Sequence, residues 1–196
     1  EVLQLRLQLT QYSATHSLDE LLQQMLDEVC RITDSPIGFY HFVEGDQKTL
    51  TLQAWSTRTL NEFCTAKGKG MHYSIDKAGV WADCIRERCP VIHNNYDALP
   101  HRKGMPPGHA PVIRELLIPV LREDKAVAVL GIGNKPFDYT QQDVETVSFL
   151  ADVAWEITLH KKADEEMERL NEILETTNDM VSISMPNGKI AYINTA

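Results

Sequence analysis

The sequence predicts an α+β domain, with a central antiparallel sheet flanked by helices and with long helices at its N- and C-terminal ends. Two runs of alternating apolar residues, 37–55 and 115–133, are each interrupted by a short polar turn, as in β-hairpins. Apolar residues recur at helical spacing before and after these runs, at 1–34 and 140–177. The strands therefore fall between helical segments of the chain, as expected for a sheet covered by helices.

Composition excludes several classes of protein. The 196 residues include 19 Lys and Arg against 28 Asp and Glu, a formal net charge of −9, so we expect no nucleic-acid partner. The four cysteines form no CxxC motif, which indicates a reducing compartment. The longest apolar run, 126–132, is shorter than the ~20 residues that span a bilayer. We therefore expect a cytoplasmic segment without membrane contact, cut from a larger protein that could itself be membrane-anchored.

The N-terminal part is predicted to form two helices. Helical spacing of apolar residues covers 1–12, although alternating leucines in this stretch also fit a strand. Ser17 and Glu20 form a capping-box pattern at the start of a second helix. That helix is expected to end near Asp34, before Pro36.

The middle of the chain alternates short strands and turns. After a hairpin at 37–43 and 50–55, the pattern predicts a strand at 71–75, a helix at 79–88 and a strand at 90–94. Residues 95–111 show no periodicity and include four prolines, as in long functional loops. The following strands, 115–121 and 125–133, are expected to be antiparallel neighbours in the middle of the sheet.

A long helix is predicted from Thr140 to about Thr177, with Asp143 completing its capping pattern. The apolar residues of its first half suffice to cover a sheet. The second half is strongly charged, but four residues keep the spacing of a coiled-coil seam: Ala163, Met167, Leu170 and Leu174. Such a helix needs a partner helix. Beyond it, residues 180–185 and 189–194 read as a hairpin turning at 186–188.

The order of these elements resembles the GAF-domain family. The local residues that support the resemblance are Gly38 to Phe42, Gly79-Val80-Trp81, Pro90 to Ile92, Leu117 to Val120, Val129 to Gly131, and Phe137 followed by Thr140 and Asp143. Residues 173–194 resemble the opening of a PAS domain. The resemblance implies a linker helix at 1–16, a GAF-like sensor domain at 17–160, a signalling helix at 161–175 and a truncated PAS domain at 176–196.

This pairing implies a non-catalytic sensory module of a signal-transduction protein, similar to bacterial sensor kinases or cyclic-dinucleotide enzymes. The resemblance implies that the module binds an unidentified small molecule and relays binding through a helical dimer linker. Its expected partners are a second copy, paired through the terminal helices, and the PAS and output domains of the same chain.

A ligand pocket is expected between the sheet and residues 71–114. Its candidate residues are Trp55, Tyr73, Trp81, Asn95, Tyr96, His109, Arg114 and Glu115. Aromatic side chains of this set supply apolar walls, and the polar members orient a ligand. The alternative is that the aromatic residues only fill the core.

The same region contains histidines and cysteines, residue types that bind metals and chromophores. His93, His101 and His109 are eight residues apart, but this spacing matches no compact metal motif, so we expect no metal and interpret them as solvated or loop-bracing. The patch His101-Arg102-Lys103 could attract an anion or be a solvated loop tip. Neither Cys84 nor Cys89 is followed by histidine, which argues against a covalent bilin, and the absence of CxxCH argues against c-type haem.

Two further functions remain open. The segment 134–143 partly resembles the signature of cyclic-nucleotide-binding GAF domains, but the spacing of Phe137 and Asp143 departs from it and favours a turn with a helix cap. A GAF-fold free methionine sulfoxide reductase would use cysteine thiols. Cys84 and Cys89, however, do not face each other on one helix, and the loop 95–111 contains no cysteine. A third possibility is a dimerisation spacer that binds no ligand.

Overall fold

The computed structural model describes residues 2–63, 72–102 and 111–194, with side chains at all of these positions except 2, 3, 52, 53, 72, 73 and 77. The chain forms two compact units, residues 1–157 and 158–196. Within the described ranges, no helix combines the length and apolar character that crossing a bilayer requires.

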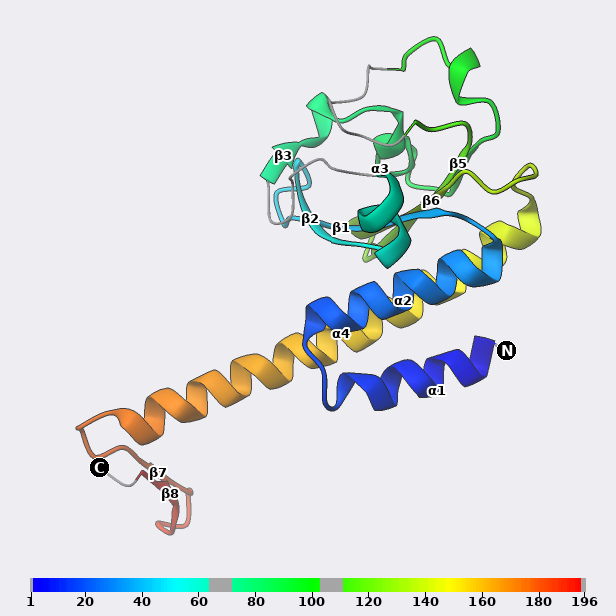
Figure 1. Ribbon diagram of the computed structural model, residues 1–196. Helices are drawn as coiled ribbons and strands as arrows, with labels where there is room; N and C mark the ends of the chain where they lie inside the picture. Colours follow the sequence, from blue (N-terminus) through cyan, green and yellow to red (C-terminus); the bar gives the residue numbers. More distant parts are fainter. Residues whose placement is uncertain (1, 64–71, 103–110, 195–196) are drawn as a thin grey trace. The chain divides into compact units, whose positions relative to one another are not determined.

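The first unit is built on a six-stranded antiparallel sheet in the order β3-β2-β1-β6-β5-β4 (Figure 1). The strands are β1 (Ile37–Val43), β2 (Thr49–Trp55), β3 (His72–Ser74), β4 (Val91–His93), β5 (Glu115–Arg122) and β6 (Lys125–Gly133). The two predicted hairpins, β1-β2 and β5-β6, are joined where β1 pairs with β6. Helices lie on both faces of the sheet, so the predicted α+β class is confirmed.

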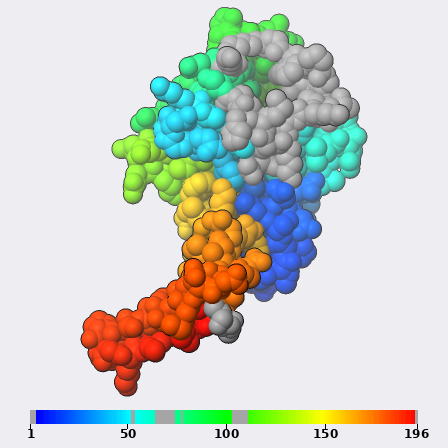
Figure 2. Space-filling model, turned by 90° about the vertical axis from the view of Figure 1, so that its left-hand side faces the viewer, coloured from blue at the N-terminus to red at the C-terminus, as the bar shows by residue number. Residues whose placement is uncertain are grey.

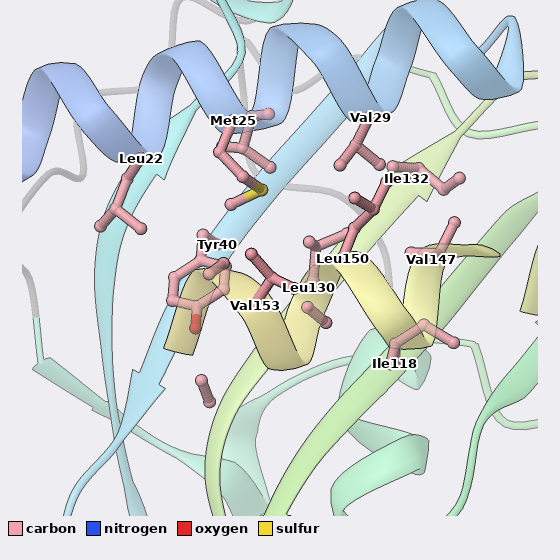
Figure 3. Packing of buried hydrophobic residues seen from close by; sticks show 14 of the residues in the cluster. Leu22, Met25, Val29, Tyr40, Ile118, Leu130, Ile132, Val147, Leu150 and Val153 are labelled. Atoms are coloured by element: carbon pink, nitrogen blue, oxygen red, sulfur yellow. The ribbon is translucent and has the colours of Figure 1, made fainter. Parts of the chain in front are cut away.

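One face of the sheet is covered by α2 (Leu18–Thr33) and the first half of α4 (Gln141–Thr176), with α1 (Val2–Ser13) packed beside them. The predicted capping box is present, because Ser17 and Glu20 bond reciprocally at the start of α2. Figure 2 shows the blue surface of α1 and α2 against the yellow first half of α4. Figure 3 shows residues of α2 and α4 interleaved with side chains of the sheet: Leu22, Met25, Val29, Tyr40, Ile118, Leu130, Ile132, Val147, Leu150 and Val153.

The opposite face lies under shorter elements. The predicted helix at 79–88 is a 3-10 turn (Val80–Ala82) followed by α3 (Asp83–Glu87), which ends where Arg88 adopts a left-handed φ of 55°. Among the described residues, three further short helices have no counterpart in the sequence prediction: a π-helix at Thr59–Phe63 and 3-10 turns at Ile75–Lys77 and Tyr96–Ala98. Single turns contain too few residues for a periodic pattern, so hydrophobic spacing could not predict them.

The second unit contains the last part of α4 and the hairpin of β7 (Ser182–Ser184) and β8 (Ile190–Ile193). Asn194 ties the hairpin to the end of the helix, because its side-chain amide donates to the carbonyls of Leu174 and Asp179. Tyr192 donates to Glu175 at 2.6 Å. The second half of α4 exposes Met167, Leu170 and Ile173. The PAS assignment, the coiled coil and the dimer stay predictions.

Candidate functional site

The alternation of β1 assigns its side chains to two separate environments. Tyr40 and Phe42 belong to the core under α2 and α4, whereas Phe39 contacts the second core cluster, which includes α3. Successive residues of a strand point to opposite faces. Phe39 and His41 therefore lie on the face below α3, where the sequence predicts the ligand pocket.

An aromatic group forms on this face. The rings of His41 and Trp81 stack with centroids 4.7 Å apart, and Phe39 meets Trp81 edge-on at 5.8 Å. His41 is almost fully buried, and this burial lowers its pKa to about 3. Its imidazole is therefore neutral near neutral pH, and the group presents apolar and uncharged surface.

A polar cluster, defined here as Asp83, His93 and Glu115, lies beside α3. His93 of β4 and Glu115 of β5 are paired across the two strands, and His93 Nδ1 donates to Glu115 Oε1 at 2.8 Å. The opposite ring nitrogen, Nε2, lies 3.7 Å from Asp83 Oδ2. All three side chains are at least nine-tenths buried. The imidazole of His93 therefore lies between two buried carboxylates, and the three side chains come from three different elements, α3, β4 and β5.

The charge of His93 depends on opposing effects. Burial lowers the pKa of His93, but the hydrogen bond from His93 to Glu115 and the charges of Glu115, Asp83 and Glu87 outweigh it. The pKa of His93 is therefore held above its ordinary value. The protonated ring is stabilised where it contacts the two carboxylates.

Two basic side chains fix Asp83 from other directions. Arg86 donates to Asp83 Oδ1 at 2.5 Å and also to the carbonyl oxygens of Ile75, Ala78 and Gly79. His101 donates from Nε2 to Asp83 Oδ2 at 2.7 Å. These contacts pair the buried carboxylate with two basic groups, as expected because burial of an unpaired charge is strongly unfavourable.

Cys84 and Tyr96 adjoin the cluster. Burial raises the pKa of the Cys84 thiol, and the negative charges of Glu115 and Asp83 raise it further. The pKa of Tyr96 is also raised, first by burial and then by Glu115. Both groups therefore keep their protons near neutral pH. A protonated, buried thiol is a poor nucleophile. Cys89, in contrast, is exposed.

The predicted site residues are distributed over several places. Trp81 belongs to the aromatic group, and Trp55 pairs with Phe39 across β1 and β2. Glu115 belongs to the polar cluster, and Tyr96 is buried beside it. The side chain of Tyr73 and the whole of His109 lie outside the described residues.

Asn95 and Arg114 make contacts of a different kind. Asn95 is exposed, and its side chain accepts from the backbone of Ala98 as the cap of a 3-10 turn. Arg114 donates to the carbonyl oxygens of Lys135 and Pro136. These are local structural bonds, and ligand contact by any of the eight predicted residues stays a prediction.

Four residues of the aromatic group and the polar cluster were not among the predicted site residues: Phe39, His41, Asp83 and His93. His93 was instead interpreted as solvated or loop-bracing, which is wrong, because its side chain is nine-tenths buried between two carboxylates. The position of His41 beside Phe39 on the inward face of a strand was the available signal. Asp83 directly precedes Cys84 in a predicted helix. Its position in that helix gave no indication that its carboxylate lies close to His93 of a strand. The predicted positive patch is largely paired, because His101 contacts Asp83 and Arg102 contacts Asp97, while Lys103 lies outside the described residues.

The turn before α4 is held by structural bonds. Lys135 pairs with Asp143 at 2.7 Å, and Asp143 accepts from the backbone of Thr140. This arrangement agrees with the predicted turn and helix cap. Within the described ranges, no group of three or more His, Cys, Asp or Glu side chains has a geometry that would hold a metal ion.

Comparison with known proteins identifies the family. The family model described as GAF domain matches residues 15–157 of the chain. This chain belongs to the GAF family. The match covers the six-stranded sheet, α2, α3 and the first half of α4. The GAF domain therefore contains both the aromatic group and the polar cluster.

A sensor protein of known sequence is homologous to this GAF domain. The methyl sulfide methyltransferase-associated sensor of Methanosarcina acetivorans is 34% identical over 172 residues, which cover 84% of this chain but 17% of that protein. The chain thus spans about a sixth of the length of this relative.

Solved structures share the fold. The GAF domain of a phosphoenolpyruvate-protein phosphotransferase from Coxiella burnetii gives a TM-score of 0.66 at 17% identity, over 84% of this chain and 96% of that one. A free methionine-R-sulfoxide reductase from Neisseria meningitidis, in complex with its substrate, gives 0.62 at 12% identity, over 81% and 89%. The GAF fold thus occurs in a reductase as well as in a domain of a phosphotransferase, and fold alone does not decide the function of this chain.

Proposed function

We propose that this GAF domain is a non-catalytic sensory module that binds a small molecule at the face under α3. The observation that supports it is the polar cluster of Asp83, His93 and Glu115. Burial of three titratable side chains in one place opposes folding, and such groups concentrate at functional sites. The aromatic group next to α3 supplies the apolar surface that small-ligand sites usually combine with a few polar groups. The homologous archaeal sensor supports the sensory role.

We further propose that α4 relays ligand binding. Its first half packs on the sheet through Val147 and Leu150, and the helix continues without interruption to Thr176. Met167 and Leu170 of its second half are exposed apolar side chains at the spacing of a seam. A second copy, paired in parallel along this seam, would cover them. The hairpin that follows is proposed to begin a PAS domain, and a kinase or cyclic-dinucleotide enzyme is the proposed output.

Native mass spectrometry of the protein purified from its host tests the ligand. We expect the folded protein to exceed its sequence mass and to release a small molecule on unfolding. The variant His93→Ala should lose that molecule, whereas Asn95→Ala, a change at an exposed cap, should retain it. A folded wild-type protein at its sequence mass would refute ligand binding and favour the spacer function.

Two pairs of variants test the relay. Glu168→Pro should uncouple the output in the full-length protein, because proline removes a helix hydrogen bond, whereas Glu168→Ala should not. Leu170→Lys should reduce dimerisation in analytical ultracentrifugation, whereas Asn171→Lys, adjacent but off the seam, should not. Unchanged output of the proline variant, or equal sedimentation of both lysine variants, would contradict the proposed relay.

The reductase alternative is disfavoured by the state of Cys84, because a buried, protonated thiol is a poor nucleophile. Cys84 is buried with a raised pKa, and Cys89 is exposed. Reduction of free methionine sulfoxide that depends on these two residues, measured with the wild type and the variant lacking both, would overturn the non-catalytic proposal.

A further inference from the structure

The two oxygens of the Asp83 carboxylate accept hydrogen bonds from different side chains, one held firmly in place and one exposed to solvent. Oδ1 accepts from Arg86, whose guanidinium also donates to the carbonyl oxygens of Ile75, Ala78 and Gly79. Four acceptors thus hold this guanidinium in place. An incoming ligand would have to break several hydrogen bonds to displace it.

Oδ2 is contacted by a side chain that can be replaced. His101 donates to it at 2.7 Å, and the His101 side chain is 56% exposed while that of Asp83 is 8% exposed. The nearest nitrogen of His93 lies 3.7 Å from Oδ2, beyond hydrogen-bond distance. His101 therefore contacts the buried carboxylate from the solvent side, through a single N–H group.

The charges around Oδ2 favour a cation over an anion. Asp83 and Glu115 are both buried, and Arg86 is the permanently charged group paired with Asp83. The His93 ring lies between the two carboxylates and carries a charge only when it is protonated. An anion placed at Oδ2 would be repelled by both carboxylates, whereas an ammonium group would gain a short, charge-assisted hydrogen bond.

We propose that the ligand of this GAF domain carries a protonated amine, and that one N–H of this amine takes the place of His101 Nε2 on Asp83 Oδ2. The proposal rests on the proposed function, since it assigns a ligand class to the same site. Without ligand, the His101 side chain occupies the position of the amine on Asp83 Oδ2. Because it competes with the ligand, its removal should strengthen amine binding.

Methylammonium is a small probe of this position, and acetate and tetramethylammonium are its matched controls. Acetate has the opposite charge, and tetramethylammonium has the charge without an N–H group. The 196-residue protein, labelled with ¹⁵N-histidine, is titrated to about 100 mM of each salt, because so small a ligand is limited to millimolar affinity. We expect methylammonium to shift the imidazole resonances of His101 and the other two salts to leave them unchanged.

Two variants complete the test. His101→Ala should bind methylammonium about fivefold more tightly, as measured on the His93 resonance, since a competing hydrogen bond is lost. His101→Gln, which retains an N–H donor, should stay near wild-type affinity. Asp83→Asn should abolish methylammonium binding. If Asp83→Asn does not fold, the comparison of His101→Ala with His101→Gln still tests the proposal.

Several results would overturn the amine assignment. These are the absence of a methylammonium shift, an equal shift with acetate, or the same affinity in His101→Ala and wild type. A neutral or anionic molecule that co-purifies from the host and depends on His93 would overturn it as well. This last result would leave the sensory proposal standing, so failure of the ligand class and failure of ligand sensing are distinguishable.

Discussion

Gly131 of β6 lies directly beneath the ring of Phe39. A Cβ atom at position 131 would overlap the ring carbons Cζ, Cε1 and Cε2 of Phe39 well inside van der Waals contact. The ring cannot move aside freely, because it meets Trp81 edge-on at 5.8 Å and His41 at 5.2 Å. Gly131→Ala therefore forces the whole aromatic group to shift.

The expected cost is that of overpacking a core, about 1–3 kcal/mol in the free energy of unfolding. For a domain of this size, that corresponds to a fall in Tm of about 2–12 °C. Gly79→Ala is the matched control, because its Cβ would lie an ordinary 3.5 Å from the nearest carbon of the Trp81 ring. Its effect should stay within about 0.5 kcal/mol.

Urea unfolding followed by circular dichroism measures both variants. The double variant Gly131→Ala with Phe39→Leu isolates the clash, since leucine lacks the ring carbons that the new methyl group would meet. In the Phe39→Leu background, Gly131→Ala should cost less than about 0.5 kcal/mol. The reasoning is refuted if Gly131→Ala is neutral in the wild-type background, or if its cost is the same in both backgrounds.

Three further predictions concern other parts of the GAF domain. The pKa of His93 is raised above 6.5 in the folded state, so the protonated ring stabilises the fold. The difference in unfolding free energy between the wild type and His93→Gln should therefore be largest below about pH 6.5 and decrease as the pH rises. Urea unfolding from about pH 6 to 9 measures this difference. Ser17→Ala should destabilise α2 by about 1 kcal/mol in thermal unfolding, because it removes the capping box, and an unchanged Tm would contradict that role. Tyr40→Phe should be neutral or stabilising by up to about 1 kcal/mol, since the buried hydroxyl of Tyr40 has no hydrogen-bond partner among the described residues, and a clear loss of stability would show that a partner exists.

The buried polar cluster explains why this face of the sheet differs from the other. Under α2 and α4, the contacts are almost entirely apolar, as between Met25 and the strands in Figure 3. Under α3, a histidine and two carboxylates replace apolar side chains. Packing alone favours the first arrangement, so the second is the one that agrees with the proposed ligand site.

The order and type of the main elements followed from the sequence because they depend on local signals. Alternation over 37–55 and 115–133 determined two hairpins, and Ser17 with Glu20 determined where α2 begins. The same rules extended α3 too far. Its predicted range, 79–88, includes a 3-10 turn that has apolar spacing much like that of an α-helix.

The candidate site depends on contacts that no local pattern encodes. Asp83, His93 and Glu115 belong to separate elements, and only the pairing of β4 with β5 and the seating of α3 above them bring the three together. Arg114 and Glu115 are neighbours in the sequence, yet Arg114, just before β5, bonds to a turn, whereas Glu115, the first residue of β5, bonds to His93 of the cluster. The sequence by itself determined the long helices, the main hairpins and the family they indicate. The tertiary structure alone decided which charged side chains meet, since burial and charge pairing act between residues that are distant in the chain.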